Sequence, residues 1–265
     1  MEEYQDIILQ KQGNIAIMSL NREEVLNAVR ARTWAELLDA LNNVKCDSAI
    51  RCLILTGKGK AFSAGQDLSE MESVLGADVN YHEVRKGLLN TQKLTREMMN
   101  MPKSIIAAVN GYAVGGGAEI AIASDIRIAS DKAKFEFAEV KVGLFATNGV
   151  TYFLPRLIGF GRAKELMLTG RRIDAQEAFQ IGLVSKVVED GMLMEEALKV
   201  AESIAETAPV SGALVKQCLN KSGEISLEDA MVYETEAIMS CVQTLDAREG
   251  AVAFLENRKP KFQGK

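Results

Sequence analysis

The sequence contains very little histidine. Among its 265 residues, His82 is the only one. A single imidazole excludes a zinc site built from several histidines, and it argues against a Ser-His-Asp triad, in which histidine is the general base. His82 lies in the polar stretch "DVNYHEVRKG", which predicts a surface position. Acid–base chemistry in this chain must therefore use carboxylates, hydroxyls or backbone amides.

Paired cysteines, long apolar runs and excess positive charge are also missing. The four cysteines form no C-x-x-C motif, which predicts reduced structural thiols. No apolar run reaches the roughly 18 residues of a membrane-spanning helix. The acidic N-terminal residues resemble neither a secretory signal nor an Arg-rich transit peptide. The net charge of −5 argues against general nucleic-acid binding. We therefore expect a cytoplasmic protein with no nucleic-acid or membrane partner.

Candidate strands and helices alternate over the first half of the chain. Two β-rich runs around Gly13-Asn14 predict a hairpin over residues 7–20. Short apolar runs predict buried strands, and apolar residues at helical spacing predict helices between them. The predicted strands are 51–57, 104–111 and 126–130, and the predicted helices are 33–45, 84–101 and 118–124. This alternation is typical of an α/β fold with crossover connections.

The second half of the chain becomes predominantly helical from about Asn148 onward. Its segments repeatedly carry apolar residues at positions i, i+3, i+4 and i+7. The last strand candidate is "LVSKVV", and residues 201–265 contain none. We predict a core over residues 1–200 and a helical oligomerisation region over residues 201–265.

Two glycine-bearing loops, within residues 53–71 and 105–130, each follow a buried strand and lead into a helix. Ligands of α/β folds bind outside the carboxyl ends of strands. The run Gly115–Gly117 costs about 0.5–1 kcal/mol of backbone entropy per glycine relative to alanine. This cost indicates that a backbone without side chains is needed at this position. Tight packing of helix on strand is the alternative explanation. Neither loop matches a phosphate-binding or dinucleotide-binding glycine motif.

Together these loops resemble the crotonase superfamily, the enoyl-CoA hydratase/isomerase group. The matching blocks follow in family order along almost the whole chain. They are "AFSAGQDL", "NGYAVGGGAEIAIASDIRIAS", "AKFEFAEVKVGL", "LPRLIGFGRAKELMLTGRRIDAQEAFQIGLVSKVV" and "DAREGAVAFLENRKPKF". The resemblance implies a spiral of repeated ββα units with a C-terminal helical region. It also implies a homo-oligomer, either a trimer or a dimer of trimers.

The resemblance implies chemistry on an acyl-CoA thioester. Family members stabilise a thioester enolate with two backbone N–H groups, which match those of Gln66 and Gly116 here. Such donors suit a negative charge that develops on a carbonyl oxygen. In family hydratases two glutamates hold a water across the α,β double bond, and their positions match Glu119 and Glu139. No metal or redox cofactor is expected, because the carboxylates are not clustered with histidine and no segment resembles a flavin or nicotinamide site. Coenzyme A itself is part of the substrate.

Coenzyme A contacts are also implied by the resemblance. The loop of Ala64, Gln66, Asp67 and Leu68, together with Gly116, is expected to contact the substrate. Lysines of "GKGK" (57–60) and Arg30 are cationic candidates for the phosphates, although surface charge explains them equally well. Phe262 and Lys265 match the C-terminal segment that closes over the ligand of a neighbouring subunit.

The sequence departs from the family pattern beside the second glutamate. Many hydratases place a proline before it and a "GAGGT"-like run after it. Here Ala138 precedes Glu139, and the later run is "FATNGVT" (145–151). This difference alters the pocket floor near the acyl chain.

Several alternatives remain open at this stage. Glu119 also fits an ordinary first-turn glutamate favoured by the helix dipole, and Glu136 or Glu139 also fits a solvent-facing position. The favoured reaction is hydration of a 2-enoyl-CoA. An isomerase needs only one glutamate, so the presence of both favours hydration. Thioesters on a carrier protein, or a non-catalytic scaffold with the same fold, are further alternatives.

Overall fold

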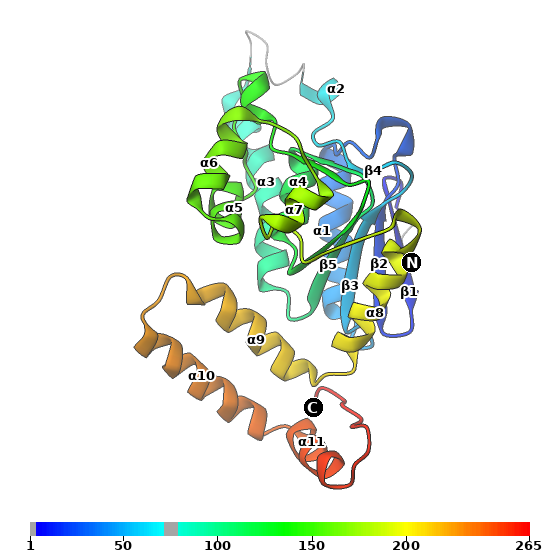
Figure 1. The fold of residues 1–265 in the computed structure, drawn as a ribbon, viewed down its shortest axis with the longest axis vertical. Helices are drawn as coiled ribbons and strands as arrows, with labels where there is room; N and C mark the ends of the chain where they lie inside the picture. Colours follow the sequence, from blue (N-terminus) through cyan, green and yellow to red (C-terminus); the bar gives the residue numbers. More distant parts are fainter. Residues whose placement is uncertain (1–3, 72–78) are drawn as a thin grey trace.

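The computed structural model describes residues 4–71 and 79–265, and its core contains two β-sheets (Figure 1). The larger sheet has the strand order β1-β2-β3-β5-β7-β10. Its strands are β1 (Ile7–Gln12), β2 (Ile15–Leu20), β3 (Cys52–Gly57), β5 (Ser104–Val109), β7 (Ile126–Ser130) and β10 (Lys186–Val188). The predicted hairpin is confirmed, since β1 and β2 pair in antiparallel fashion. The three predicted buried strands are also confirmed as β3, β5 and β7, which pair in parallel.

The smaller sheet was not predicted. It has the order β4-β6-β8-β9, and its strands are β4 (Ala61–Ser63), β6 (Tyr112–Val114), β8 (Lys134–Glu136) and β9 (Ile173–Asp174). Strands of two or three residues are too short to show alternation in a sequence. β3, β5 and β7 lie in the larger sheet, and each is followed by a strand of the smaller sheet and then by a helix. This repetition confirms the predicted spiral of ββα units.

Helices cover both faces of the larger sheet. Leu53 and Leu55 of β3 pack in the main core with the helices α1 and α3, whereas Cys52 and Ile54 pack with α8 on the opposite face. The helices are α1 (Ala31–Cys46), α2 (Leu68–Met71), α3 (Tyr81–Asn100), α4 (Gly116–Ala123), α5 (Val150–Ile158), α6 (Phe160–Thr169), α7 (Ala175–Gln180), α8 (Leu193–Ala205), α9 (Pro209–Ser222), α10 (Leu227–Val242) and α11 (Leu245–Leu255). Burial on both faces explains why the strands have continuous apolar sequences.

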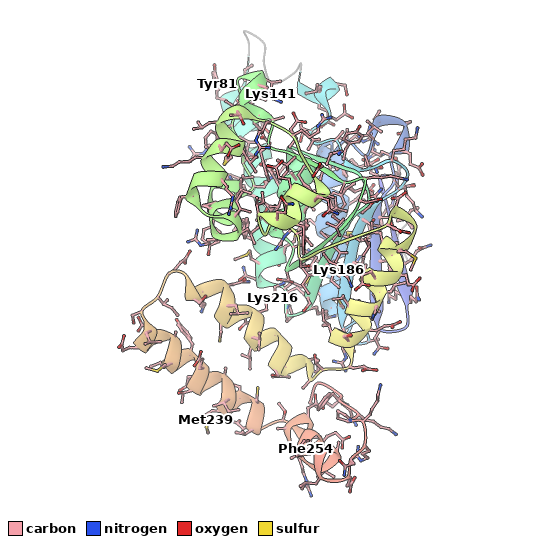
Figure 2. The ribbon with its side chains drawn as sticks, in the orientation of Figure 1. Tyr81, Lys141, Lys186, Lys216, Met239 and Phe254 are labelled. Carbon is pink, nitrogen blue, oxygen red and sulfur yellow. The ribbon has the colours of Figure 1, made fainter. Side chains whose placement is uncertain are left out.

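The helices α9, α10 and α11 project from this core (Figure 1). Lys216 of α9 points back toward the core, and its Nζ donates to the Asp125 carboxylate at 2.8 Å and to the Met98 carbonyl at 2.9 Å (Figure 2). In contrast, α10 has no buried residue. Met239 and Phe254 are labelled on the outer helices in Figure 2, and they are 51% and 83% exposed. The arm α9–α11 therefore presents apolar side chains to its surroundings.

Two sequence predictions about isolated residues agree with the structure. His82 is exposed in the first turn of α3. The four cysteines are unpaired thiols, and they are Cys46, Cys52, Cys218 and Cys241. Over residues 4–71 and 79–265, no helix has both the length and the apolar character needed to cross a membrane.

Candidate active site

The two glycine loops meet at the N-terminus of α4. Gly65 has a φ of 91°, and a Cβ there would lie 2.7 Å from the Val114 carbonyl oxygen and 3.4 Å from the Gly116 nitrogen. A Cβ on Gly117 would lie 2.5 Å from the Ser63 carbonyl oxygen. These separations leave no room for a side chain, so the glycines let one loop approach the other. The triple glycine is thereby explained by close backbone contact as well as by helix initiation.

Two backbone amides in these loops have no hydrogen-bond partner among residues 4–71 and 79–265. Gly115 is the N-cap of α4 with a φ of 47°, and Gly116 is the first helical residue. Its amide belongs to the group that a helix leaves without an internal acceptor. Within the described parts of the chain, no hydrogen bond is made by the amide of Gly116 or by that of Gln66. The structure therefore brings together the two donors that the sequence predicted.

The loop that carries Gln66 is held by the segment before α1. The Val29 amide donates to the Gly65 carbonyl at 2.8 Å, and the Asp67 amide donates to the Val29 carbonyl at 2.9 Å. The Trp34 Nε1 atom also donates to the Gln66 side-chain oxygen at 3.2 Å. These contacts flank the Gln66 amide on both sides and fix its position.

The Asp67 carboxylate is also occupied by other groups. It accepts hydrogen bonds from the Ser69 hydroxyl at 2.7 Å and from Arg22 at 2.9 Å, and these lower its pKa. Asp67 consequently anchors the loop, and its backbone remains close to Gln66. Ala64 is half-buried, while Leu68 is exposed at the start of α2.

Glu119 lies in the first turn of α4 and is 3% exposed. Its Oε1 accepts hydrogen bonds from the Thr147 amide at 2.8 Å and from the Asn148 amide at 3.4 Å. Its Oε2 accepts one from the Asn148 side-chain Nδ2 at 2.6 Å. An ordinary first-turn glutamate is solvated, so this burial and bonding argue against that alternative. Three donors thus hold the two oxygens of this carboxylate in place.

Glu139 begins the short 3-10 helix η3 (Glu139–Val142) and is half-buried. Burial raises the pKa of its carboxyl, and the nearby charge of Glu119 raises it further. The side chain lies beside the N-terminus of α4, because a Cβ on Gly115 would be 3.2 Å from its Oε1. Glu119 and Glu139 thus both lie near the N-terminus of α4, although they belong to different segments.

Glu136, three residues earlier, has a different environment. It is 6% exposed, and its two oxygens accept from Lys141 at 3.0 Å and from Arg172 at 2.7 Å. Burial favours its neutral form, but the two cations outweigh burial and lower its pKa. Glu136 is therefore an ion-paired structural residue. The structure does not support the alternative in which Glu136 or Glu139 faces bulk solvent.

The predicted phosphate-binding and C-terminal residues are not gathered around Glu119 within one chain. Arg30 forms a two-pronged ion pair with Asp6, at 2.8 Å and 2.6 Å. Phe262 packs against α11, since a Cβ on Gly250 would lie 3.5 Å from its ring. The carbonyl of Lys265 accepts from the Leu245 amide at 2.7 Å. Figure 1 shows the C-terminus beside α11, well separated from α4.

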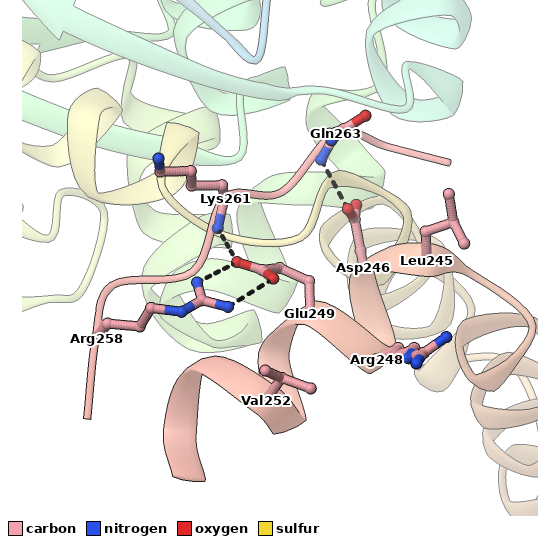
Figure 3. A pocket seen from close by; sticks show the side chains of 8 residues that line it. All are labelled: Leu245, Asp246, Arg248, Glu249, Val252, Arg258, Lys261 and Gln263. Atoms are coloured by element: carbon pink, nitrogen blue, oxygen red, sulfur yellow. Dashed lines mark hydrogen bonds and ion pairs between the residues drawn. The ribbon is translucent and has the colours of Figure 1, made fainter. Parts of the chain in front are cut away.

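The basic C-terminal segment is tied to α11 rather than frayed (Figure 3). Glu249 accepts from Arg258 at 2.6 Å and from the Lys261 amide at 2.7 Å. Asp246, which is 2% exposed, accepts from the Gln263 amide at 2.7 Å. A hollow opens between these groups, and its lining comprises Leu245, Asp246, Arg248, Glu249, Val252, Arg258, Lys261 and Gln263. It lies outside the glutamate site.

Sequence reasoning missed the roles of Thr147 and Asn148 as partners of Glu119. Their segment, 145–151, was noted only because it departs from the family's glycine-rich run. That departure was the one available signal. The contact itself joins residues 29 positions apart, so only the fold reveals it.

Comparisons with known proteins agree with this architecture. The model of the enoyl-CoA hydratase/isomerase family matches residues 10–265. The chain is 41% identical to a short-chain-enoyl-CoA hydratase of Clostridium acetobutylicum, with 97% of each chain covered. It is 40% identical to a crotonyl-CoA hydratase of Syntrophomonas wolfei, with 99% of each covered.

A solved structure gives the same result for the fold. The enoyl-CoA hydratase of Bacillus anthracis superposes with a TM-score of 0.93 at 37% sequence identity, covering 98% of this chain and 100% of that one. Sequence and architecture match along nearly the whole length. This protein therefore belongs to the enoyl-CoA hydratase/isomerase family.

Proposed function

We propose that this protein is an enoyl-CoA hydratase, a lyase that adds water across the α,β double bond of a short-chain 2-enoyl-CoA thioester. The relatives named short-chain-enoyl-CoA hydratase and crotonyl-CoA hydratase support both the reaction and the chain length. The observation that carries the proposal is the position of two carboxylates, Glu119 and Glu139, beside two unpaired backbone amides. Hydration needs both an acid and a base, which this pair supplies.

The amides of Gln66 and Gly116 form the oxyanion hole in this proposal. They donate to the thioester oxygen, on which negative charge accumulates as the enolate forms. Removing one donor of this kind from other enzymes slows catalysis about 100-fold to 1,000-fold. The N-terminal end of α4 adds the favourable field of the helix dipole. The contacts between Gly65 and Gly116 keep both donors in place before the substrate arrives.

The two carboxylates divide the proton transfers. Glu119 accepts a proton from water while the water oxygen forms a bond to Cβ, and the double-bond electrons move onto the thioester oxygen. Glu139 donates a proton to Cα as the enolate collapses, so the product gains one complete water molecule. The three donors around Glu119 suit a base. The raised pKa of Glu139 suits an acid, because burial and the Glu119 charge both favour its protonated form.

Coenzyme A binding uses the loop beside the oxyanion hole. Ala64 and Leu68 flank Gln66 and Asp67, and the backbone of this loop contacts the adenine and pantetheine parts in the proposal. Arg30 contributes as a cation whose guanidinium remains paired with Asp6.

A homo-oligomer completes this site. The exposed apolar side chains of the arm α9–α11 support burial against other copies of the chain, as a trimer or a dimer of trimers. In that assembly Phe262 and Lys265 reach the ligand of a neighbouring subunit. We place the enzyme in the cytoplasm.

Product analysis tests the reaction. Purified protein is incubated with crotonyl-CoA, and the masses of the thioester products are measured by mass spectrometry. Hydration adds the mass of one water, whereas isomerisation leaves the mass unchanged. A product of unchanged mass or an unreacted substrate contradicts the proposed reaction.

A proline at residue 116 tests the oxyanion hole. Gly116→Pro removes the N–H, and the first turn of a helix tolerates proline. We expect a loss of turnover of about 100-fold to 1,000-fold. Gly116→Ala keeps the N–H, and its Cβ would make only ordinary contact with Trp34 at 3.4 Å. Equal losses in the two folded variants would place the donor elsewhere.

A further inference from the structure

Asn148 is a buried residue that donates two hydrogen bonds to Glu119, and it is not among the predicted site residues. It is 3% exposed and lies just before α5, between Thr147 and Gly149. Its backbone amide and its side-chain Nδ2 both donate to Glu119, one to each carboxylate oxygen. The Nδ2 contact, at 2.6 Å, is the shortest of the three hydrogen bonds to this carboxylate. The Asn148 side chain therefore donates to Oε2 of Glu119, the oxygen that receives no hydrogen bond from these backbone amides.

The orientation of the Asn148 amide is dictated by this contact. A flip of the amide would place Oδ1 against a carboxylate oxygen, and two acceptors repel each other. In the observed orientation Oδ1 has no partner, and it is the only buried side-chain nitrogen or oxygen so stranded in the described chain. Buried acceptors are almost always paired in native proteins, so this exception needs an explanation. The hydrogen bond from Nδ2 to Glu119 supplies one, because it fixes the orientation that leaves Oδ1 without a partner.

The backbone around Asn148 is held independently of its side chain. Gln92 of α3 donates from Nε2 to the Thr147 carbonyl at 3.1 Å, and Thr95 of α3 donates to the Asn148 carbonyl at 3.5 Å. These contacts fix the loop against α3. Shortening the Asn148 side chain should therefore leave the two backbone amides near Glu119.

We propose that Asn148 is a positioning residue for the hydration reaction, acting through Glu119. This inference rests on the proposed function. Backbone amides fix Oε1, and the Asn148 amide fixes Oε2, so the carboxylate cannot rotate. Its remaining lone pairs then point in one direction, toward the water that it deprotonates. A general base needs hydrogen-bond reach and alignment before its basicity matters.

Two substitutions test this role. Asn148→Ala removes the donor and the stranded acceptor together, and we expect kcat for crotonyl-CoA hydration to fall at least about 30-fold. KM, and the Kd of the unreactive analogue butyryl-CoA, should change less than about threefold, because the proposed role acts through Glu119 and not through substrate binding. Asn148→Asp keeps the shape but replaces the donor with an acceptor. It should lose at least as much kcat as the alanine variant.

Asn220→Ala is the matched control. Its Nδ2 also donates to an oxygen, the Met99 carbonyl at 3.0 Å, but it lies on α9 away from α4. We expect its kcat to stay within about threefold of the native value. A drop in kcat that is equal in both alanine variants would indicate a general structural effect and overturn the proposal.

The remaining outcomes separate this inference from the proposed function. An active native enzyme with an equally active Asn148→Ala variant overturns only the role of Asn148. A more active aspartate than alanine variant also overturns it, because shape rather than the donor would then matter. A native enzyme that does not hydrate crotonyl-CoA or longer enoyl-CoA esters overturns both. If butyryl-CoA binding is lost along with kcat, Asn148 acts on the pocket and not on Glu119.

Discussion

The segments that carry the two glutamates differ in how firmly they hold them. Glu119 lies on α4, a helix whose buried apolar side chains pack in the main core, and it receives three hydrogen bonds. Glu139 sits on the short helix η3, which has no buried residue. No hydrogen bond from another described residue reaches its carboxylate, and burial with the Glu119 charge raises its pKa.

The carboxylate of Glu119 is surrounded by donors from the loop 147–148, whereas the carboxylate of Glu139 is placed in a site where burial raises its pKa. Three hydrogen bonds replace the water that Glu119 loses on burial, whereas the backbone amide of Glu139 itself offers only a partial replacement at the Glu139 carboxylate. The charge of Glu119 also disfavours ionisation of Glu139. The asymmetry that assigns the base and the acid also predicts that replacing each glutamate with glutamine changes the melting temperature in opposite directions. Substitutions at the two glutamates test that asymmetry.

The largest effect is expected from Glu119→Gln. Losing the base should reduce kcat about 1,000-fold or more. The new NH2 group faces either the two backbone amides at Oε1 or the Asn148 Nδ2 at Oε2, so two hydrogen bonds or one are lost in a buried place. The melting temperature should consequently fall by about 2–6 °C. Steady-state kinetics and thermal unfolding measure both changes. An unchanged melting temperature would mean that the hydrogen bonds around Glu119 contribute little.

Glu139→Gln should reduce kcat at least about 100-fold while acyl-CoA binding persists. Glutamine cannot donate an acidic proton to Cα, but it keeps the size of the side chain. Turnover and the Kd of butyryl-CoA, measured together, separate chemistry from binding. Near-native turnover would remove Glu139 from the mechanism.

The pH dependence of kcat should report Glu139. The acid must be protonated, so kcat should fall about tenfold per pH unit once the pH exceeds its raised pKa. Rates measured from about pH 5 to pH 10 reveal this alkaline limb. The residual activity of Glu139→Gln should lack the limb. A limb that persists unchanged in this variant would belong to another group.

The smallest effect concerns stability. The folded pKa of Glu139 lies above its unfolded value, so ionisation above the unfolded pKa of about 4.3 costs the folded state more than the unfolded state. Glu139→Gln removes this cost and should raise the melting temperature by about 1–3 °C at pH 7. The gain should vanish below about pH 4, where both states are protonated. A variant that is less stable at pH 7 would contradict the assigned environment.

Much of this arrangement could be predicted from the sequence, because it depends on local patterns. Apolar runs identified β3, β5 and β7, which carry the glycine loops. The loops and family order pointed to Gln66, Gly116, Glu119 and Glu139. The smaller sheet was missed because strands of two or three residues leave no periodic signal. Asn148 was missed because its contact with Glu119 is set by tertiary packing across 29 positions.

The C-terminal helices show a second limit of prediction from the sequence. Its helices follow from apolar periodicity, but a sequence does not tell which apolar side chains meet the core and which face another molecule. The structure leaves Met239 and Phe254 exposed and buries Lys216. The division at residue 200 and the role of residues 201–265 in assembly remain predictions.

The most direct test follows the absorbance of the enoyl thioester in crotonyl-CoA with the native enzyme and with the two glutamine variants. We expect rapid loss of the absorption band with the native enzyme and at least about 100-fold slower loss with Glu119→Gln and with Glu139→Gln. All three proteins should bind butyryl-CoA alike. A stable band with the native enzyme, or rapid loss with either variant, would contradict the claim that two carboxylates share this reaction.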